Sequence, residues 1–134
     1  MQTVGPLADL WIVPEGVVAE VEKKRPVRIK MDRHVLFKII KQTVREIEPD
    51  ADIILYGSRS RRDADEESDW DFLILVDGPV TDARTDHIRH QLYEIEWEFG
   101  EVISSIVRNR EEWQSGKFKV MPFHHRVRQE GVWI

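Results

Sequence analysis

Two short apolar runs, each joined to a polar motif, constrain the fold of this chain more than any other feature. The runs Ile53–Tyr56 and Trp70–Val76 are apolar enough to form buried strands. The first run leads directly into Gly57-Ser58, and ten residues separate this pair from Asp69-Trp70-Asp71, which opens the second run. Both motifs are therefore expected at strand ends.

The two aspartates are expected to share one face of the second strand. Because side chains alternate along a strand, Asp69 and Asp71 lie about 7 Å apart on one face, whereas Trp70 and Phe72 lie on the other. Two carboxylates on one face can bind one cation. Magnesium prefers such hard oxygen ligands, and substrate phosphates commonly complete its coordination. The pair therefore predicts a metal site that works together with a phosphate ligand.

The Gly-Ser pair and the arginines that follow it suit a phosphate ligand. Gly57 allows the backbone to approach a phosphate closely, and Ser58 offers a hydroxyl beside a short helical turn. We expect Arg59 and Arg62 to add phosphate contacts. The alternative interpretation is an ordinary turn with acids near a strand end. Asp71 counts against it, because an acid inside an apolar run is costly to bury without a partner.

The stretch 55–76 resembles the active-site signature of the DNA polymerase β-like nucleotidyltransferase superfamily, in particular its single-domain branch of minimal nucleotidyltransferases. A coarser similarity runs from Asp32 to the C-terminus, where residues 123–133 resemble the closing helix and Glu-Gly turn of the family. The resemblance implies that Gly57 and Ser58 hold the nucleotide phosphates. It also implies that Asp69 and Asp71 bind magnesium or manganese and act in catalysis.

The chain departs from the family pattern at three places. Position 62 is Arg where the family commonly has Gly, and position 70 is Trp where a smaller aliphatic residue is usual. Many members also carry another acid on the next strand, which here reads 100–107. The nearest acid is Glu101, our predicted third catalytic residue, but the corresponding position could equally be Ser104. Alternation would place these two side chains on opposite faces.

The resemblance implies a magnesium-dependent enzyme that transfers a nucleoside monophosphate, AMP from ATP, to a hydroxyl and releases pyrophosphate. The chain has no room for a second domain that would hold the acceptor, so the acceptor is expected from outside. By analogy with the minimal branch, we expect it on a partner protein such as a HEPN-type toxin, which would make this chain antitoxin-like. The alternative is an interaction module that binds nucleotide with weak or no catalysis, and Ser104 in place of an acid would favour it.

Composition sets the remaining bounds. A chain of 134 residues with 41% hydrophobic residues is enough for one domain with a real core. It has no cysteine and no apolar stretch as long as a membrane span. Because the start does not resemble a signal peptide either, we expect a cytoplasmic protein. The net charge of −5, with both signs mixed, does not favour stable nucleic-acid binding.

Periodicity and turn signals place the other elements. They predict a helix from Asp32 to about Glu48, a second helix from Thr81 to about Gly100, and a third helix over 122–130 followed by an edge strand at 132–134. Strands that alternate with helices indicate an α/β (α+β) fold, with a small mixed sheet flanked by helices as in the polymerase β-like fold.

The N-terminal residues 1–30 lie outside the resemblance and are treated as an extension of a nucleotidyltransferase domain at 31–134. Apolar runs at 17–21 and 27–31 predict a β-hairpin. We expect this hairpin to add an edge to the core. The alternatives are a cover over the site, a docking surface for a partner, or a contact in a homodimer.

Overall fold

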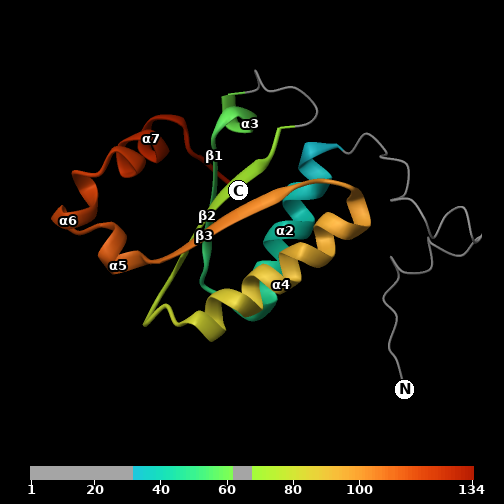
Figure 1. Ribbon diagram of the computed structural model, residues 1–134, viewed down its shortest axis with the longest axis horizontal. Coiled ribbons are helices and arrows are strands. Elements are labelled where there is room, and N and C mark those ends of the chain that lie inside the picture. Colours follow the sequence, from blue (N-terminus) through green and yellow to red (C-terminus); the bar gives the residue numbers. More distant parts are fainter. Residues whose placement is uncertain (1–31, 62–67) are drawn as a thin grey trace, which may run out of the picture.

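The computed structural model describes residues 32–61 and 68–134 (Figure 1). The hairpin predicted for residues 1–30 and the predicted phosphate contact Arg62 lie outside this part of the chain. In chain order the elements are α2 (Arg33–Ile47), β1 (Asp52–Tyr56), α3 (Ser58–Arg61), β2 (Trp70–Val76), α4 (Asp82–Phe99), β3 (Ile103–Asn109), α5 (Arg110–Trp113), α6 (Gly116–Lys119), α7 (Pro122–Glu130) and β4 (Val132–Trp133).

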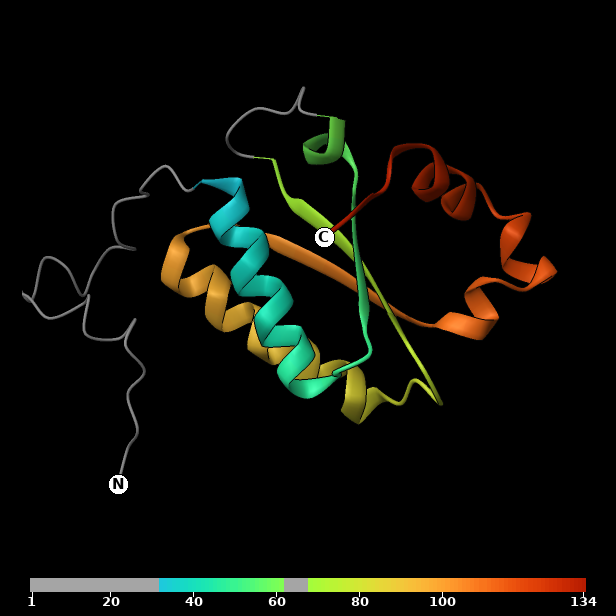
Figure 2. The same ribbon diagram turned by 180° about the vertical axis from the view of Figure 1, so that it is seen from behind.

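The strands form one mixed sheet in the order β3-β2-β1-β4. Strand β1 is antiparallel to both β2 and β4, whereas β2 and β3 run parallel. In this register Asp71 of β2 lies between Tyr56 of β1 and Ser104 of β3. The long helices α2 and α4 lie side by side on one face of the sheet, and α5, α6 and α7 lie toward the other face (Figures 1 and 2).

The face under α2 and α4 holds the larger hydrophobic cluster. Helix α2 contributes Leu36, Ile40 and Val44, and α4 contributes a second stripe of Ile88, Leu92 and Ile95. These stripes follow the spacing of one helical face, so each helix buries its apolar side against the sheet. From the sheet, this cluster takes alternate strand residues that include Ile53, Leu55, Trp70, Phe72, Ile74 and Val76.

Both long helices begin and end at the residues that the sequence predicts. The Asp32 side chain accepts a hydrogen bond from the backbone N–H of His34 at 2.8 Å, and the Thr81 hydroxyl accepts one from Arg84 at 3.1 Å. Gly100 ends α4 in the left-handed conformation, with φ of 67°. Such caps satisfy backbone groups that the helix ends leave without partners.

A smaller cluster forms on the opposite face, where α5–α7 cover part of the sheet. It contains Ile54, Tyr56, Leu73 and Leu75 from the strands, with Trp113 and Val127 from the helices. Among the described residues, no helix combines the length and apolar character needed to cross a membrane.

Candidate active site

The two polar motifs meet where β1 ends and β2 begins. Gly57 follows β1 with φ of 81°, a conformation that favours glycine. A β-carbon at this position would lie 2.5 Å from Oδ2 of Asp71, so only a residue without a side chain lets this carboxylate approach the turn. The Ser60 hydroxyl and backbone N–H both donate to the Gly57 carbonyl, at 2.6 and 3.1 Å, and close the turn that opens α3. The structure therefore joins Gly57-Ser58 and Asp71 in one site.

The two aspartates differ in their surroundings. Asp69 is exposed just before β2, whereas Asp71 is half-buried within the sheet. Burial raises the pKa of the Asp71 carboxyl, and the negative charge of Asp69 raises it further; Arg126 opposes this shift, and Glu130 adds to it. Together the two carboxylates provide hard oxygen atoms of the kind that a divalent cation prefers as ligands.

A third carboxylate reaches the site from α7. The Gly57 backbone N–H donates to Oε2 of Glu130 at 2.6 Å, and the same oxygen lies 3.1 Å from Nη1 of Arg61. Gly131 makes this possible, because a β-carbon there would lie 2.4 Å from the Val127 carbonyl oxygen and 2.8 Å from the side chain of Ile54. The end of α7 can therefore close onto β1 and bring Glu130 to the Gly57 turn.

Sequence reasoning did not identify Glu130 as a site residue. The motif Glu130-Gly131 is visible in the sequence as the end of a helix and resembles the Glu-Gly turn of the family, but neither feature indicates what Glu130 contacts. Its partner, Gly57, is 73 residues away along the chain. The available signal was the glycine itself, which marks a position where a side chain would collide with the Val127 carbonyl and with the Ile54 side chain of β1.

The position next to Asp71 on the third strand is a serine. Asp71 pairs with Ser104 in the parallel register, so these side chains share a face. Glu101 precedes β3 and is buried; the indole Nε1–H of Trp70 donates to its Oε2 at 3.3 Å. Because Trp70 packs in the cluster under the long helices, Glu101 lies on the face away from Asp71. The catalytic role of Glu101 stays a prediction that this placement does not favour.

The arginines after the Gly-Ser pair have defined partners. The guanidinium of Arg59 lies 4.4 Å from the centre of the Trp70 ring, and its Nε donates to the Ser68 carbonyl at 3.0 Å. Its Nη2 also lies 4.0 Å from Glu101. Arg59 is thus bound to Trp70 and Glu101, whereas Arg61 pairs with Glu130. Contacts from Arg59 to a phosphate stay a prediction, as do those from Arg62.

Among the described residues, Asp69 and Asp71 are two candidate metal ligands, and they do not make a complete coordination shell. No group of three or more His, Cys, Asp or Glu side chains among residues 32–61 and 68–134 is arranged to hold a metal ion. A pair of carboxylates nevertheless fits magnesium or manganese, because these ions commonly complete their coordination with water and substrate phosphates. The donor set therefore suits a metal that binds together with its nucleotide.

Comparison with known proteins agrees with this geometry. A family model described as a nucleotidyltransferase domain matches residues 37–127, about two thirds of the chain. The chain belongs to this family. A search of curated proteins found no match.

The family assignment confirms the predicted superfamily and, in general terms, a nucleotidyl-transfer function. The match spans the Gly57 turn and both aspartates. The mixed four-stranded sheet flanked by helices confirms the predicted fold class. The minimal branch of the superfamily stays a prediction.

Proposed function

We propose that this nucleotidyltransferase moves a nucleoside monophosphate from a nucleoside triphosphate, with AMP from ATP as the favoured case, to a hydroxyl acceptor. One observation carries the proposal: the Asp71 carboxylate packs directly against the backbone of Gly57. A phosphate held at the Gly-Ser turn and a cation held by the aspartates would then be neighbours. This adjacency is what attack on a metal-bound triphosphate requires.

The residues of the candidate active site have separate roles in this proposal. Gly57 permits close approach of the phosphates, the Ser58 hydroxyl hydrogen-bonds a phosphate oxygen, and Asp69 and Asp71 hold magnesium or manganese. The bound ion would neutralise phosphate charge and lower the pKa of the attacking hydroxyl. Glu130 fixes the Gly57 turn through the hydrogen bond to its N–H. The acceptor hydroxyl loses its proton to solvent, its oxygen forms a bond to the α-phosphorus, the bond from that phosphorus to the pyrophosphate oxygen breaks, and pyrophosphate leaves.

The acceptor approaches, in our proposal, from the side of β3. A pocket of about 490 Å³ lies between α4 and β3, and Ser104 is one of its lining residues. Most of the lining comes from α4, so this pocket opens on the helix-covered side of β3, and an acceptor bound there would reach the aspartates around the β3 edge of the sheet. We propose an acceptor hydroxyl on a partner protein, with a HEPN-type toxin as the example that fold-level analogy suggests.

Metal-dependent nucleotide binding tests the site before any acceptor is known. The full chain is titrated by calorimetry with non-hydrolysable analogues of ATP, GTP, CTP and UTP, with and without magnesium. We expect binding that requires the metal and is lost in an Asp69→Ala, Asp71→Ala variant. The exposed aspartate at the start of α4 gives the matched control, Asp82→Ala, which should bind as the unmodified protein does. Binding that ignores both the metal and the double substitution would refute the proposed site.

A second candidate function, nucleotide binding without turnover, is favoured by one observation. Ser104, rather than an acid, stands beside Asp71 in the sheet. A partner protein that is neutralised equally well by the Asp69→Ala, Asp71→Ala variant would support this binding-module function. Transfer of label from α-labelled nucleotide to the partner, lost in the same variant, would support the enzyme.

A further inference from the structure

A second pocket lies on the other side of α7 from the aspartates. On one side of this helix, Phe123 packs edge-on against Tyr56, with ring centroids 5.2 Å apart, and Glu130 bonds to Gly57. On the other side, a pocket of about 430 Å³ opens between α7, the ends of α5 and α6, and β4. Its lining residues are Ile54, Trp113, Gln114, Lys119, His124, Val127, Arg128, Gly131 and Trp133.

His124 forms part of this pocket and is unusual for a buried residue. Only 2% of it is exposed, and its ring stacks on the indole of Trp113 with a centroid distance of 4.3 Å. Neither Nδ1 nor Nε2 has a hydrogen-bond partner within the described part of the chain. A neutral imidazole carries one donor and one acceptor nitrogen, and leaving a buried polar group without a partner costs about 1–3 kcal/mol. His124 therefore carries hydrogen-bonding capacity that the surrounding protein does not use, although both of its nitrogens are buried rather than open to the pocket.

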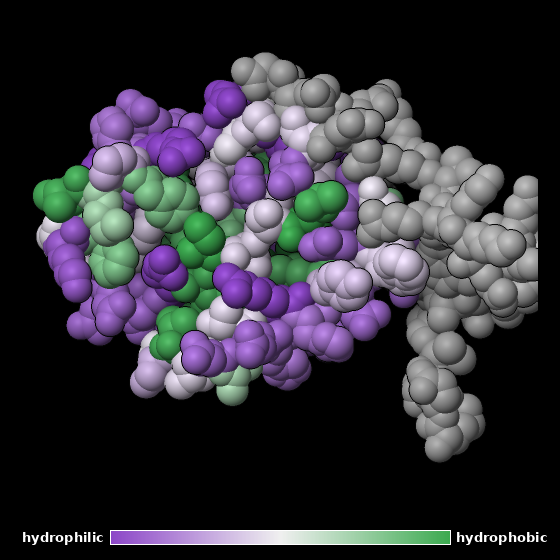
Figure 3. Space-filling model, viewed as in Figure 1, coloured by the Kyte–Doolittle hydropathy of each residue, from purple (hydrophilic) through white to green (hydrophobic). Residues whose placement is uncertain are grey.

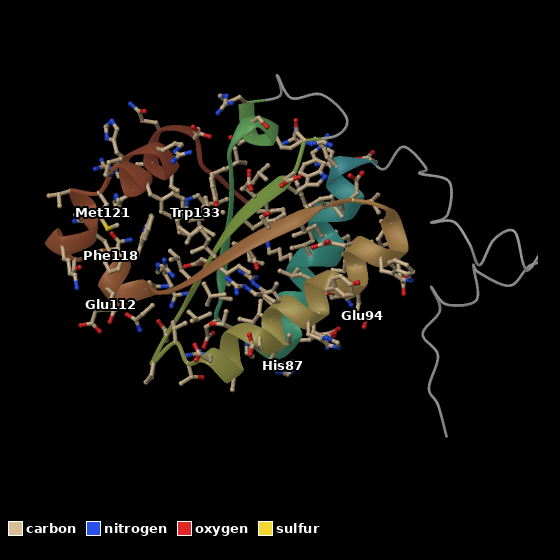
Figure 4. All side chains as sticks on the ribbon, in the orientation of Figure 1. His87, Glu94, Glu112, Phe118, Met121 and Trp133 are labelled. Atoms are coloured by element: carbon tan, nitrogen blue, oxygen red, sulfur yellow. The ribbon has the colours of Figure 1, made fainter. Side chains whose placement is uncertain are left out.

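The charge and shape of the pocket indicate what could use that capacity. Its charged lining residues are Lys119 and Arg128, both exposed, and none of the residues that line it is acidic. This local positive charge contrasts with the net charge of −5 for the whole chain. Trp133 is 61% exposed and lies opposite Ile54 in the β1–β4 pair, so it offers a flat aromatic surface (Figure 4). Figure 3 shows that apolar side chains also gather on the surface over α5–α7.

We propose that this pocket binds a small planar anion, meaning one aromatic or heteroaromatic ring system that carries a phosphate or carboxylate. The ring lies against Trp133, the anionic group pairs with Lys119 and Arg128, and a rotation of the His124 side chain brings one of its buried nitrogens to a polar atom of the ligand. Ligand pockets are usually about 300–1,000 Å³, so a volume near 430 Å³ suits a ligand of this size. Binding here requires no metal, because the aspartate pair lies beyond α7.

The test measures binding in a variant that lacks the aspartates of the proposed transfer site. The full chain with Asp69→Ala and Asp71→Ala is titrated in buffer that contains a chelator. The probes are AMP for a phosphate source, benzoate for a carboxylate source, and adenosine and inorganic phosphate for the ring and the anion alone. We expect saturable binding of AMP or benzoate at millimolar concentration or below. Adenosine and phosphate should each bind at least about tenfold more weakly, since each lacks one of the two recognised groups.

Neighbouring histidines provide a matched pair of variants. His124→Phe keeps a ring stacked on Trp113 but removes both nitrogens, and we expect it to weaken binding at least about tenfold. His125→Phe changes the next residue, which is exposed and does not line the pocket, and should leave binding unchanged. Replacing Arg128 by Gln on the exposed rim should weaken AMP and benzoate binding but not adenosine binding. Nitrogen chemical shifts of the His124 ring, followed during the titration, locate the ligand.

Thermal stability completes the test. Without ligand, the His124→Phe variant should melt at the same temperature as the parent or higher, because a buried polar group without partners has been removed. A marked loss of stability would mean that the His124 nitrogens serve the fold, and would overturn the proposal. So would the absence of saturable binding by AMP and benzoate at millimolar concentration, or equal binding in the two histidine variants. Because the aspartates are already replaced, these results do not depend on the proposed transfer reaction.

Discussion

The two faces of the sheet are built from alternate residues of the same strands, yet they differ in chemistry. Under α2 and α4, the strand β2 presents Trp70, Phe72, Ile74 and Val76, which are at most 4% exposed and pack in one apolar cluster. On the opposite face the same strand presents Asp71 before two buried leucines. One face therefore stabilises the strands, and the other carries the site.

One short strand thus packs against the helices on one face and carries polar site residues on the other. Because the side-chain period of a strand is two, a polar residue can be placed on one face without disturbing the packing on the other. The polar groups on the α7 face lower the stability of the folded protein. Burial raises the pKa of Asp71, and the buried ring nitrogens of His124 have no partners among the described residues. Proteins commonly tolerate such costs at functional sites.

The largest effect should follow from weakening the helix-covered face. Phe72 is fully buried and packs edge-on with Phe37 at 6.2 Å. We expect Phe72→Ala to lower the free energy of unfolding by about 3–5 kcal/mol, because the substitution removes apolar contacts and leaves a cavity. Urea unfolding measures the loss. Tyr93→Ala, at a position 56% exposed on α4, is the control and should change it by less than about 0.5 kcal/mol. A similar loss in both variants would contradict the proposed division between the faces.

A smaller effect, on binding rather than stability, should follow from replacing Glu130. Without its carboxylate the Gly57 N–H and Arg61 each lose a partner. We expect Glu130→Ala to weaken metal-dependent nucleotide binding about 10–100-fold, because the turn that holds the phosphates loses a hydrogen bond to a charged group, worth about 1.5–3 kcal/mol. Glu130→Gln keeps an acceptor for the Gly57 N–H but loses the charge that pairs with Arg61. Its nucleotide affinity should therefore lie between those of the unmodified protein and Glu130→Ala. The neighbouring exposed residue gives the control Gln129→Ala.

The opposite outcome for Glu130 would also be informative. Its carboxylate bonds to a backbone N–H in the turn where we place the phosphates. If Glu130→Ala binds nucleotide more tightly, the carboxylate competes with a phosphate oxygen for that group. Calorimetric titration of the three variants beside the unmodified chain separates the two cases.

The helix-covered face could be predicted from the sequence almost completely. Helices α2 and α4 are long and periodic, and capping residues stand at both their N-termini, so local patterns determine their bounds. The strands β1 and β2 and the edge strand β4 were also predicted. Helices α5 and α6 were not, because a helix of four residues is too short to show a period of 3.6.

The site was predicted less completely, because its finer geometry depends on contacts distant in sequence. Alternation left Glu101 and Ser104 as alternatives until the register of β3 against β2 was known. Glu101 lies before the first residue of the strand, and its contact with Trp70 places it on the face that alternation from Ile103 also gives. The position of Arg59 over Trp70 could not be inferred from a run of charged residues either. The sequence identified the ligand types, and tertiary contacts decided which of them meet.

The contact between Trp70 and Glu101 can be tested by a milder change. Trp70→Phe keeps an aromatic ring near Phe37, which lies 5.6 Å away, but removes the indole N–H that bonds to Glu101. We expect a loss of about 1–3 kcal/mol in the free energy of unfolding, because a buried carboxylate loses a donor. Metal-dependent nucleotide binding should not change. A fall in transfer activity in Glu101→Gln, with Trp70→Phe unaffected, would instead support the predicted catalytic role of Glu101.

The smallest effect on stability should follow from replacing Asp71, although this residue is central to the proposed chemistry. The pKa of Asp71 is raised above its ordinary value of 3.8, chiefly by burial and then by the charge of Asp69. The folded state therefore holds this proton more tightly than the unfolded state. The resulting stabilisation is fully present below about pH 4 and is lost as pH rises through the folded-state pKa.

Asparagine at this position has no such proton to lose. Without metal or nucleotide, Asp71→Asn should match the unmodified protein below about pH 4. Above the folded-state pKa it should melt a few degrees higher, because a partly buried charge beside Asp69 has been removed. Melting curves between acidic and neutral pH measure the difference, and the exposed-site control Asp82→Asn should not reproduce it. Magnesium with a nucleotide analogue should then stabilise the unmodified protein more than the variant, reversing the order. Asp71→Asn could instead be the less stable protein at neutral pH without ligands. This result would show that the Asp71 carboxylate stabilises the fold. It would contradict our view that the site residues on the α7 face lower the stability of the protein.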